Sequence, residues 1–240
     1  MKMIGYLPLG YPSLEKSIEM ADAYIEGGCD GIEISIPCPD PRYEKDTIKK
    51  WMQQAYESIS DYRVYFEAVC EIRGRHPEKE IYTMVYQEVL SAVTPEVYAD
   101  FCVRAGIDCV ISADLTEESA EALEKRNVSR CSFGSFILDP KRLRNCLRNG
   151  GLIYMQTKPF PGQSPLPGYE SLEAVIRYMR DLGITRPIYC GGGIQSPEDA
   201  KSVKKAGADG FFVGTAIVTL SDDLGLLRQT LREYKEAAES

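Results

Sequence analysis

Short apolar runs alternate with longer amphipathic stretches from one end of this 240-residue chain to the other. Each run is followed by a stretch with apolar residues at helical spacing, as between Ser13 and Ile25. This alternation predicts repeated strand–helix units, which build sheets of parallel strands. The candidate strands are Met3–Pro8, Gly31–Ile36, Ile81–Tyr86, Cys109–Ala113, Ser129–Phe133, Leu152–Gln156, Ile188–Gly191 and Gly210–Val213.

Eight such units either close into a barrel or form an open, doubly wound sheet. Their number and even spacing, with no linker or low-complexity stretch between them, favour the barrel. We therefore expect one α/β domain over residues 1–240, a single (β/α)8 TIM barrel. In this fold the loops that follow the strands carry the chemistry. The only histidine, His76, precedes the third strand, so it is predicted to be a solvated loop residue without a catalytic role.

The composition excludes several classes of function. A net charge of −8 argues against binding to nucleic acid or to an anionic membrane surface. No run approaches the roughly 18 apolar residues of a membrane span, and the first residues do not form a signal peptide. The eight cysteines contain no CxxC pair, which argues against a metal site and for reduced, mostly buried thiols. We expect a soluble, cytoplasmic protein without a metal ion or cofactor.

Two glycine-containing segments near the C-terminus each run from a predicted strand into a predicted helix. They are Cys190–Glu198, with three consecutive glycines, and Ala208–Val218, in which Thr215 follows Gly214. Glycine has no Cβ, so backbone N–H groups there can approach phosphate oxygens, and a helix N-terminus adds unpaired donors. The loops after strands seven and eight bind phosphate in many barrels. We predict a phosphate site; the alternative is that these glycines only make tight turns.

The second predicted strand contains a carboxylate, Glu33, between isoleucines. Because side chains alternate along a strand, Ile32 and Ile34 face the helices and Glu33 faces the barrel lumen. A partly desolvated carboxyl group there would have a raised pKa, as a general acid/base near neutral pH requires. The alternative is a structural glutamate in an ion pair, but no Lys or Arg is expected to face the lumen at that level.

The opening of the chain, GYLPLGYPSLEKSIEMADAYIEGGCDGIEISIPCPDP, resembles that of the tryptophan synthase α subunit family. That family has a Gly-x-Asp motif followed by a strand reading ELG(I/V)PFSDP. Its third, fourth, sixth, seventh and eighth strands are similar to YTMVYQEVL, AGIDCVISADL, NGGLIYMQT, CGGGIQSPED and AGADGFFVGTAIV. The resemblance spans nearly the whole chain. It implies a lyase of tryptophan biosynthesis that splits indole-3-glycerol phosphate by retro-aldol cleavage.

The resemblance also implies roles for individual residues. Glu33 matches the family's catalytic glutamate, which protonates the indole ring carbon and handles the proton of a glycerol hydroxyl. Tyr154 matches its active-site tyrosine, although ordinary packing inside the barrel is an equally good interpretation of Tyr154, Tyr6 and Met84. The remaining matches are the phosphate ligands Gly162, Gly193, Gly214 and Thr215 (where serine is usual) and the substrate-pocket residues Tyr6, Met84 and Asp114.

Two loops depart from the family's pattern. After the second strand, the family has an aspartate that assists at the indole nitrogen. Here Glu44 stands at that position and is one methylene longer, with Asp46 as the alternative. After the sixth strand, the family's mobile GVTG loop is replaced by Lys158–Gln163, where Pro161 stands in place of a threonine. A loop stiffened by proline is expected to close less adaptably.

The chain begins at the first predicted strand, so the family's N-terminal helix, which plugs the barrel floor, is expected to be missing. In the family, the two altered loops also contact the β subunit that receives indole, and their changes argue against that partnership here. Two alternatives to the lyase stay open: a barrel enzyme for another phosphorylated substrate, and a non-catalytic phosphate-binding protein. Glu33 argues against the second, because a binding module has no need of a desolvated carboxylate.

Overall fold

A computed structural model describes all residues, 1–240, and contains one sheet of nine strands in the order β5-β4-β3-β2-β1-β9-β8-β7-β6. Every pair of neighbouring strands is parallel, so the C-terminal ends of the strands lie together at one rim. The strands are β1 (Lys2–Pro8), β2 (Gly31–Ser35), β3 (Glu80–Met84), β4 (Cys109–Ile111), β5 (Ser129–Arg130), β6 (Ser132–Gly134), β7 (Ile153–Gln156), β8 (Ile188–Gly191) and β9 (Gly210–Val213).

The predicted fifth strand, Ser129–Phe133, is divided in two. Its first part, β5, pairs with β4, and its second part, β6, pairs with β7. Between them the Cys131 amide donates to the Val110 carbonyl (2.9 Å), and the Ser132 amide donates to the Leu152 carbonyl (3.1 Å). The chain therefore passes from one neighbouring strand to the other within two residues. This step completes a nearly closed ring, so the predicted (β/α)8 barrel is confirmed.

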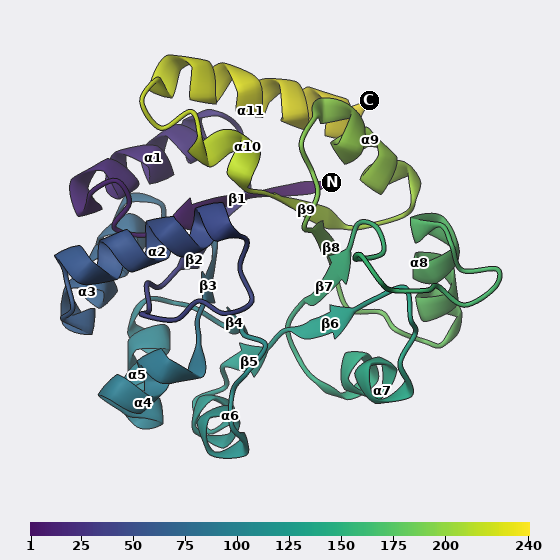
Figure 1. Ribbon diagram of the computed structural model, residues 1–240, viewed down its shortest axis with the longest axis horizontal. Helices are drawn as coiled ribbons and strands as arrows, with labels where there is room; N and C mark the ends of the chain where they lie inside the picture. Colours follow the sequence, from purple (N-terminus) through teal and green to yellow (C-terminus); the bar gives the residue numbers. More distant parts are fainter.

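The helices surround the strands, with α11 across the top of Figure 1 and α6 beside β5 at the bottom. Strands β2, β3 and β9 are each followed by two helices, where the sequence pattern predicted one. None of the helices is long and apolar enough to cross a bilayer. Their bounds are α1 (Leu14–Glu26), α2 (Asp46–Ser58), α3 (Tyr62–Arg75), α4 (Gln87–Val93), α5 (Pro95–Arg104), α6 (Glu117–Glu124), α7 (Pro140–Arg148), α8 (Leu172–Asp181), α9 (Pro197–Lys205), α10 (Thr215–Val218) and α11 (Leu224–Glu239).

Aromatic side chains fill the middle of the barrel. The rings of Tyr154 (β7) and Phe212 (β9) stack with their centroids 4.7 Å apart. Tyr82 of β3 meets both Phe212 and Tyr189 of β8 edge to face, at 6.4 Å in each case. Strand β3 is three positions away from β9 in the sheet, so these contacts cross the lumen. The interior is a packed core, as in other barrels of this type.

Carboxylates with several partners stabilise the N-terminal rim. Asp30 precedes β2 and accepts hydrogen bonds from the Met3 amide (2.8 Å) and from the Lys235 ammonium group (2.7 Å). Asp209 stands in the same place before β9 and accepts from the Ile188 amide (2.7 Å). Each aspartate therefore fastens the start of its own strand to a neighbouring strand.

The lower end of the lumen contains a third partnered carboxylate, Glu80, the first residue of β3. It accepts hydrogen bonds from the hydroxyl groups of Tyr82 (2.8 Å) and Tyr189 (3.2 Å) and forms an ion pair with Lys2 (3.1 Å). These contacts join β3 to β1 and β8 at this end of the barrel.

His76 lies on the N-terminal side of β3, as predicted, but the prediction that it is a solvated loop residue is wrong. It follows the last residue of α3, and only 16% of its side chain is exposed. Its Nε2 atom lies 2.7 Å from Oδ1 of Asp22 on α1. The cysteines are free thiols, and all but Cys70 are buried, as the sequence predicted.

The Asp30 contacts give a prediction for stability. Burial raises the pKa of Asp30, but the Lys235 ammonium group and the Met3 amide outweigh burial and bring the pKa below its ordinary value of 3.8. The stability that the ionised carboxylate contributes is therefore present above pH 3.8 and is lost as the pH falls through the lower folded-state pKa. Asp30→Asn should lower the free energy of unfolding by about 1–3 kcal/mol near neutral pH.

Urea unfolding at neutral pH and at about pH 3 measures this effect. The difference in the free energy of unfolding between wild type and Asp30→Asn should be smaller at about pH 3 than at neutral pH. The control is Asp222→Asn, because Asp222 is exposed, and it should leave stability within about 0.5 kcal/mol of wild type. An Asp30→Asn variant as stable as this control would contradict the prediction.

Candidate active site

Glu33 lies in the lumen near the C-terminal rim, in the middle of β2. Only 4% of the residue is exposed, and it pairs in register with Tyr6 of β1 and Tyr82 of β3. Burial, with a smaller contribution from the negative charge of Glu44, raises the pKa of Glu33 to about 8. No basic side chain opposes these two effects. The ion-paired structural glutamate considered above is therefore not what the structure contains.

Two tyrosines, the buried Tyr6 and the half-buried Tyr154, lie near the same carboxyl group on other strands. Burial first, and then the nearby carboxylates Glu33 and Glu44, raise the pKa values of Tyr6 and Tyr154 well above the ordinary value. Tyr6 comes from β1 and Tyr154 from β7, on different sides of the ring. The structure thus brings Glu33, Glu44, Tyr6 and Tyr154 together at one end of the lumen.

Glu44, in the loop before α2, lies over this end of the lumen. Burial raises its pKa, and a hydrogen bond from Tyr86 and the charges of two lysines partly offset that rise. Asp46 is instead the exposed first residue of α2. Of the two carboxylates that the sequence left open, only Glu44 acts electrostatically on Glu33.

Tyr86 is a residue that the sequence analysis did not single out. Its hydroxyl donates to Glu44 Oε1 (3.3 Å) and accepts from the Tyr43 amide (3.3 Å). The rings of Tyr43 and Tyr86 also stack, with centroids 6.0 Å apart. These contacts hold the loop that carries Glu44. The available signal was the position of Tyr86 at the C-terminal end of a predicted strand, on the rim where the chemistry of a barrel lies.

The two glycine segments lie at the same rim, after β8 and β9. Gly193 has a φ of 129°, a conformation that side chains rarely allow. No backbone carbonyl accepts a hydrogen bond from the amides of Gly193 or Gly214. Tyr154 lies directly over Gly191, and a Cβ atom on Gly214 would stand 3.6 Å from Cβ of Tyr6. The two tyrosines beside Glu33 therefore also contact both glycine segments.

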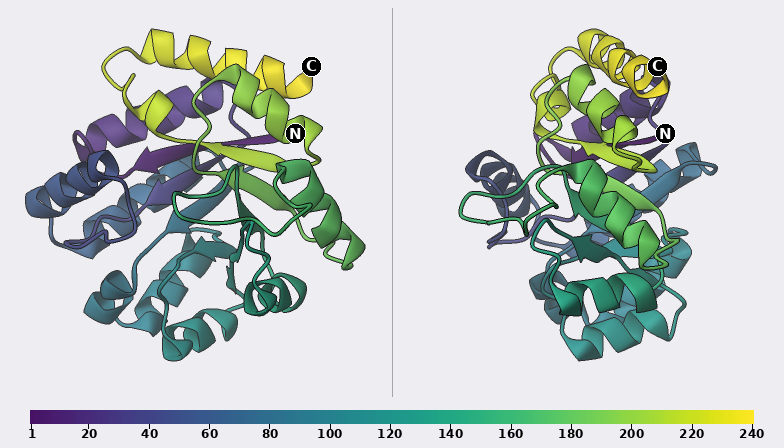
Figure 2. Two further views of the ribbon diagram at one scale, coloured as in Figure 1. Left: turned by 45° about the vertical axis from the view of Figure 1, so that its right-hand side comes forward. Right: turned by 90° about the vertical axis from the view of Figure 1, so that its right-hand side faces the viewer.

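The loop after β7 lies against the first glycine segment. Thr157 Oγ1 donates to the Gly192 carbonyl (2.8 Å). Cε of Lys158, which begins the segment Lys158–Gln163 and to which the sequence assigned no role, is 3.5 Å from the place where a Cβ atom on Gly193 would stand. Figure 2 (right) shows this loop and α2 projecting from the same end of the molecule.

The other predicted residues differ in how they relate to this cluster. Thr215 is the first residue of α10 and is half-buried, and Met84 is buried at the end of β3. Gly162 is exposed in a turn with a φ of 81°, where an added Cβ would meet nothing within 4 Å. Oδ1 of Asp114 accepts from the Gln87 amide (3.0 Å), whereas its buried Oδ2 has no partner.

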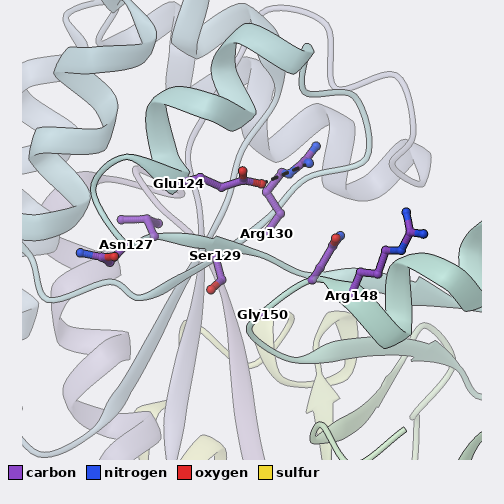
Figure 3. Close-up of a pocket in the computed structure, with 8 residues that line it drawn as sticks. Glu124, Asn127, Ser129, Arg130, Arg148 and Gly150 are labelled. Atoms are coloured by element: carbon purple, nitrogen blue, oxygen red, sulfur yellow. Dashed lines mark ion pairs between the residues drawn. The ribbon is translucent and has the colours of Figure 1, made fainter. Parts of the chain in front are cut away.

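A cavity of about 460 Å³ opens far from this cluster, at the start of β5 (Figure 3). Polar groups line it, including Glu124, Ser129, Arg130 and Arg148, and Glu124 and Arg130 form an ion pair at 3.5 Å. None of the catalytic or binding residues predicted from the sequence lines this cavity. The C-terminal rim, where Glu33 and the glycine segments meet, is therefore the better candidate for chemistry.

Fold and site together define a parallel (β/α)8 barrel with a neutral carboxyl group in its lumen and unpaired backbone amides at the same rim. The family model described as "Tryptophan synthase alpha chain" matches residues 1–239. The chain belongs to the tryptophan synthase α chain family.

Similar sequences and solved structures agree with this assignment. The tryptophan synthase α chain of Novosphingobium aromaticivorans is 30% identical, over 91% of this chain and 83% of that protein. That of Klebsiella pneumoniae is 28% identical, over 98% and 93%. A solved structure from Aquifex aeolicus has a TM-score of 0.86 and 26% identity, over 98% and 92% of the two chains. Tryptophan synthase from M. tuberculosis has a TM-score of 0.81 and 25% identity, over 99% and 92%.

The raised pKa of Glu33 gives a second stability prediction. The folded protein keeps a proton on Glu33 up to about pH 8, whereas the unfolded chain releases it near the ordinary pKa of 4.5. Folding stability should therefore fall as the pH rises between these values. Glu33→Gln has no proton to lose, so it should be more stable than wild type by about 1–3 kcal/mol near pH 8.

Thermal unfolding between about pH 5 and pH 8 measures the difference in stability between wild type and Glu33→Gln. This difference should be small at about pH 5 and should increase steadily toward pH 8. A difference that does not change with pH would mean that Glu33 is ionised in the folded protein, and the prediction would be wrong.

Proposed function

We propose that this protein cleaves indole-3-glycerol phosphate to indole and glyceraldehyde 3-phosphate. The observation that carries this proposal is the pair of carboxyl groups at the lumen mouth, with the Glu33 pKa raised to about 8 by burial and by Glu44. A carboxyl group that stays neutral at pH 7 can donate a proton, and the neighbouring carboxylate whose negative charge raises its pKa can accept one. Family membership favours this reaction over one on another phosphorylated substrate.

The two carboxyl groups have complementary tasks in this reaction. Neutral Glu33 gives its proton to ring carbon C3 while ionised Glu44 takes the proton of the ring nitrogen. The Glu33 carboxylate then takes the proton of the adjacent glycerol hydroxyl, and the bond between C3 and the glycerol carbon breaks. The electron pair of that bond returns to the ring, and Glu44 returns the proton to nitrogen. Both carboxyl groups end in their starting states.

The glycine segments would hold the phosphate group at the other end of the substrate. The unpaired amides of Gly193 and Gly214 are suitable donors, and Thr215 begins a helix whose dipole favours an anion. The Lys158 side chain over Gly193 adds a positive charge in a protein with a net charge of −8. An enzyme of tryptophan biosynthesis with eight free thiols suits a reducing compartment, and we propose the cytoplasm.

Activity measurements test the roles of the carboxyl groups. Wild type should release indole from indole-3-glycerol phosphate, and Glu33→Gln should lower kcat/KM by about 10²–10⁴-fold, as expected for loss of a general acid/base. Because Glu33 must be protonated to act first, kcat/KM should fall as the pH rises through about 8. Glu44→Gln should also lower kcat/KM, whereas Asp46→Asn should not.

Each assay is run with and without an added tryptophan synthase β subunit, which also decides whether such a partner activates the protein. Circular dichroism shows whether the variants fold. Wild type that forms no more indole than folded Glu33→Gln under either condition would overturn the proposed reaction.

Calorimetry with inorganic phosphate tests the phosphate site separately from the chemistry. A Cβ atom in Gly193→Ala would stand 2.8 Å from Thr157 Oγ1, at a φ of 129°, so the turn must shift. We expect a loss of affinity of roughly tenfold or more, and Lys158→Gln should cost roughly threefold, as for one exposed charge contact. Gly183→Ala is the control, because Gly183 also has a positive φ (86°) but follows α8 at the opposite rim. If Gly193→Ala and Gly183→Ala lose equal affinity for inorganic phosphate, the proposed phosphate site is wrong.

A further inference from the structure

Gln156, the last residue of β7, is a buried polar residue with no evident structural role in the barrel. Only 7% of it is exposed, and its Oε1 atom is buried without a hydrogen-bond partner in the protein. A buried amide without partners destabilises a fold, and such groups are rare in proteins. Within the protein, a leucine or methionine of similar size would leave no buried polar atom unpaired. Stability therefore does not explain a glutamine at this position.

The position of Gln156 does suggest a role. Side chains alternate along β7, so Gln156 faces the lumen on the same side as Tyr154, one step nearer the rim. It pairs in register with Gly191, the first glycine of the segment after β8. Tyr154, below it, lies against Gly191 and is affected by the charge of Glu33. Gln156 therefore lies beside the start of the glycine segment, on the lumen face that Tyr154 shares.

A substrate whose phosphate group lies on the glycine segments extends from there into the lumen, where the buried Gln156 side chain lies next to Gly191. In a glycerol phosphate ester that middle part is a carbon chain with hydroxyl groups. A hydroxyl can donate to the amide oxygen and accept from the amide nitrogen, which would satisfy the unpartnered group. A site built to hydrogen-bond a hydroxyl also discriminates strongly against ligands that lack it.

We propose that Gln156 binds a hydroxyl group of the glycerol chain and selects hydroxylated phosphate esters over alkyl ones. This inference rests on the proposed function, since it takes the glycine segments as the phosphate site. Gln156 is then a specificity-determining residue that contacts the substrate, in addition to the residues that the family resemblance identifies.

Three ligands separate the contributions to binding: inorganic phosphate, n-propyl phosphate and glycerol 3-phosphate. Wild type should bind glycerol 3-phosphate roughly tenfold more tightly than n-propyl phosphate, the effect of about one good hydrogen bond. In Gln156→Leu and in Gln156→Met this preference should disappear, while the affinity for inorganic phosphate stays within about twofold. Two variants are used so that a packing defect in one does not decide the result.

Thermal stability gives an independent readout. If Gln156 serves the ligand, both variants should have a Tm equal to or above that of wild type, because they remove an unpartnered buried amide. The matched control is Thr83→Val, since Thr83 is buried and accepts a hydrogen bond from the Tyr98 hydroxyl (2.8 Å). That variant should have a lower Tm and an unchanged preference among the ligands.

The outcomes distinguish the inference from the proposed function. Wild type that binds inorganic phosphate but shows no preference for glycerol 3-phosphate, or variants that keep the preference, would overturn the role of Gln156 alone. If the variants have a lower Tm and lose affinity equally for all three ligands, Gln156 has a structural role and does not select the ligand. Failure of wild type to bind inorganic phosphate would overturn the phosphate site itself, and the role of Gln156 with it.

Discussion

The burial of one carboxyl group in the lumen is the constraint on which the rest of the site depends. Glu33 sits in the middle of a strand whose two neighbours fix its register, so it cannot turn away without breaking the sheet. No cation neutralises it, and the negative charge of Glu44 adds to the effect of burial. The low-energy response is to keep the proton, which makes Glu33 an acid at pH 7. Burial within the scaffold, with a smaller contribution from Glu44, sets this protonation state.

Parallel strands then bring Glu33 and the proposed phosphate site to the same rim. Tyr6 and Tyr154 connect the two, because each is affected by the charge of Glu33 and each contacts a glycine segment. Glycine is required at residue 191, where the Tyr154 ring occupies the space of a Cβ atom. The glycine segments thus leave room for the two tyrosines, in addition to the role proposed for their amides.

Strand periodicity predicted most of the fold and the orientation of Glu33, since alternation within β2 needs no knowledge of distant contacts. The division of the fifth strand could not be predicted, because it depends on which neighbour pairs with each half. Whether Glu44 or Asp46 reaches the lumen depends on the path of a loop. The contact of His76 with Asp22 joins residues 54 apart in the sequence. In each case a tertiary contact decided the outcome, and a local pattern contains no information about it.

The polar groups at the two rims differ in a way that separates structure from function. At the N-terminal rim, Asp30, Asp209 and Glu80 each have two or more partners. At the C-terminal rim, Gln156 Oε1 and Asp114 Oδ2 are buried without any, and Glu33 is buried without a cation. Partnered groups stabilise the barrel, whereas unpartnered groups weaken it unless something else binds them. A fold under selection for stability alone would have replaced the second set with apolar residues. Arg130 Nε, in β5, is also buried without a partner, but Gln156, Asp114 and Glu33 lie together at one rim, beside unpaired glycine amides. This grouping supports the proposal that the C-terminal rim binds a polar, anionic substrate.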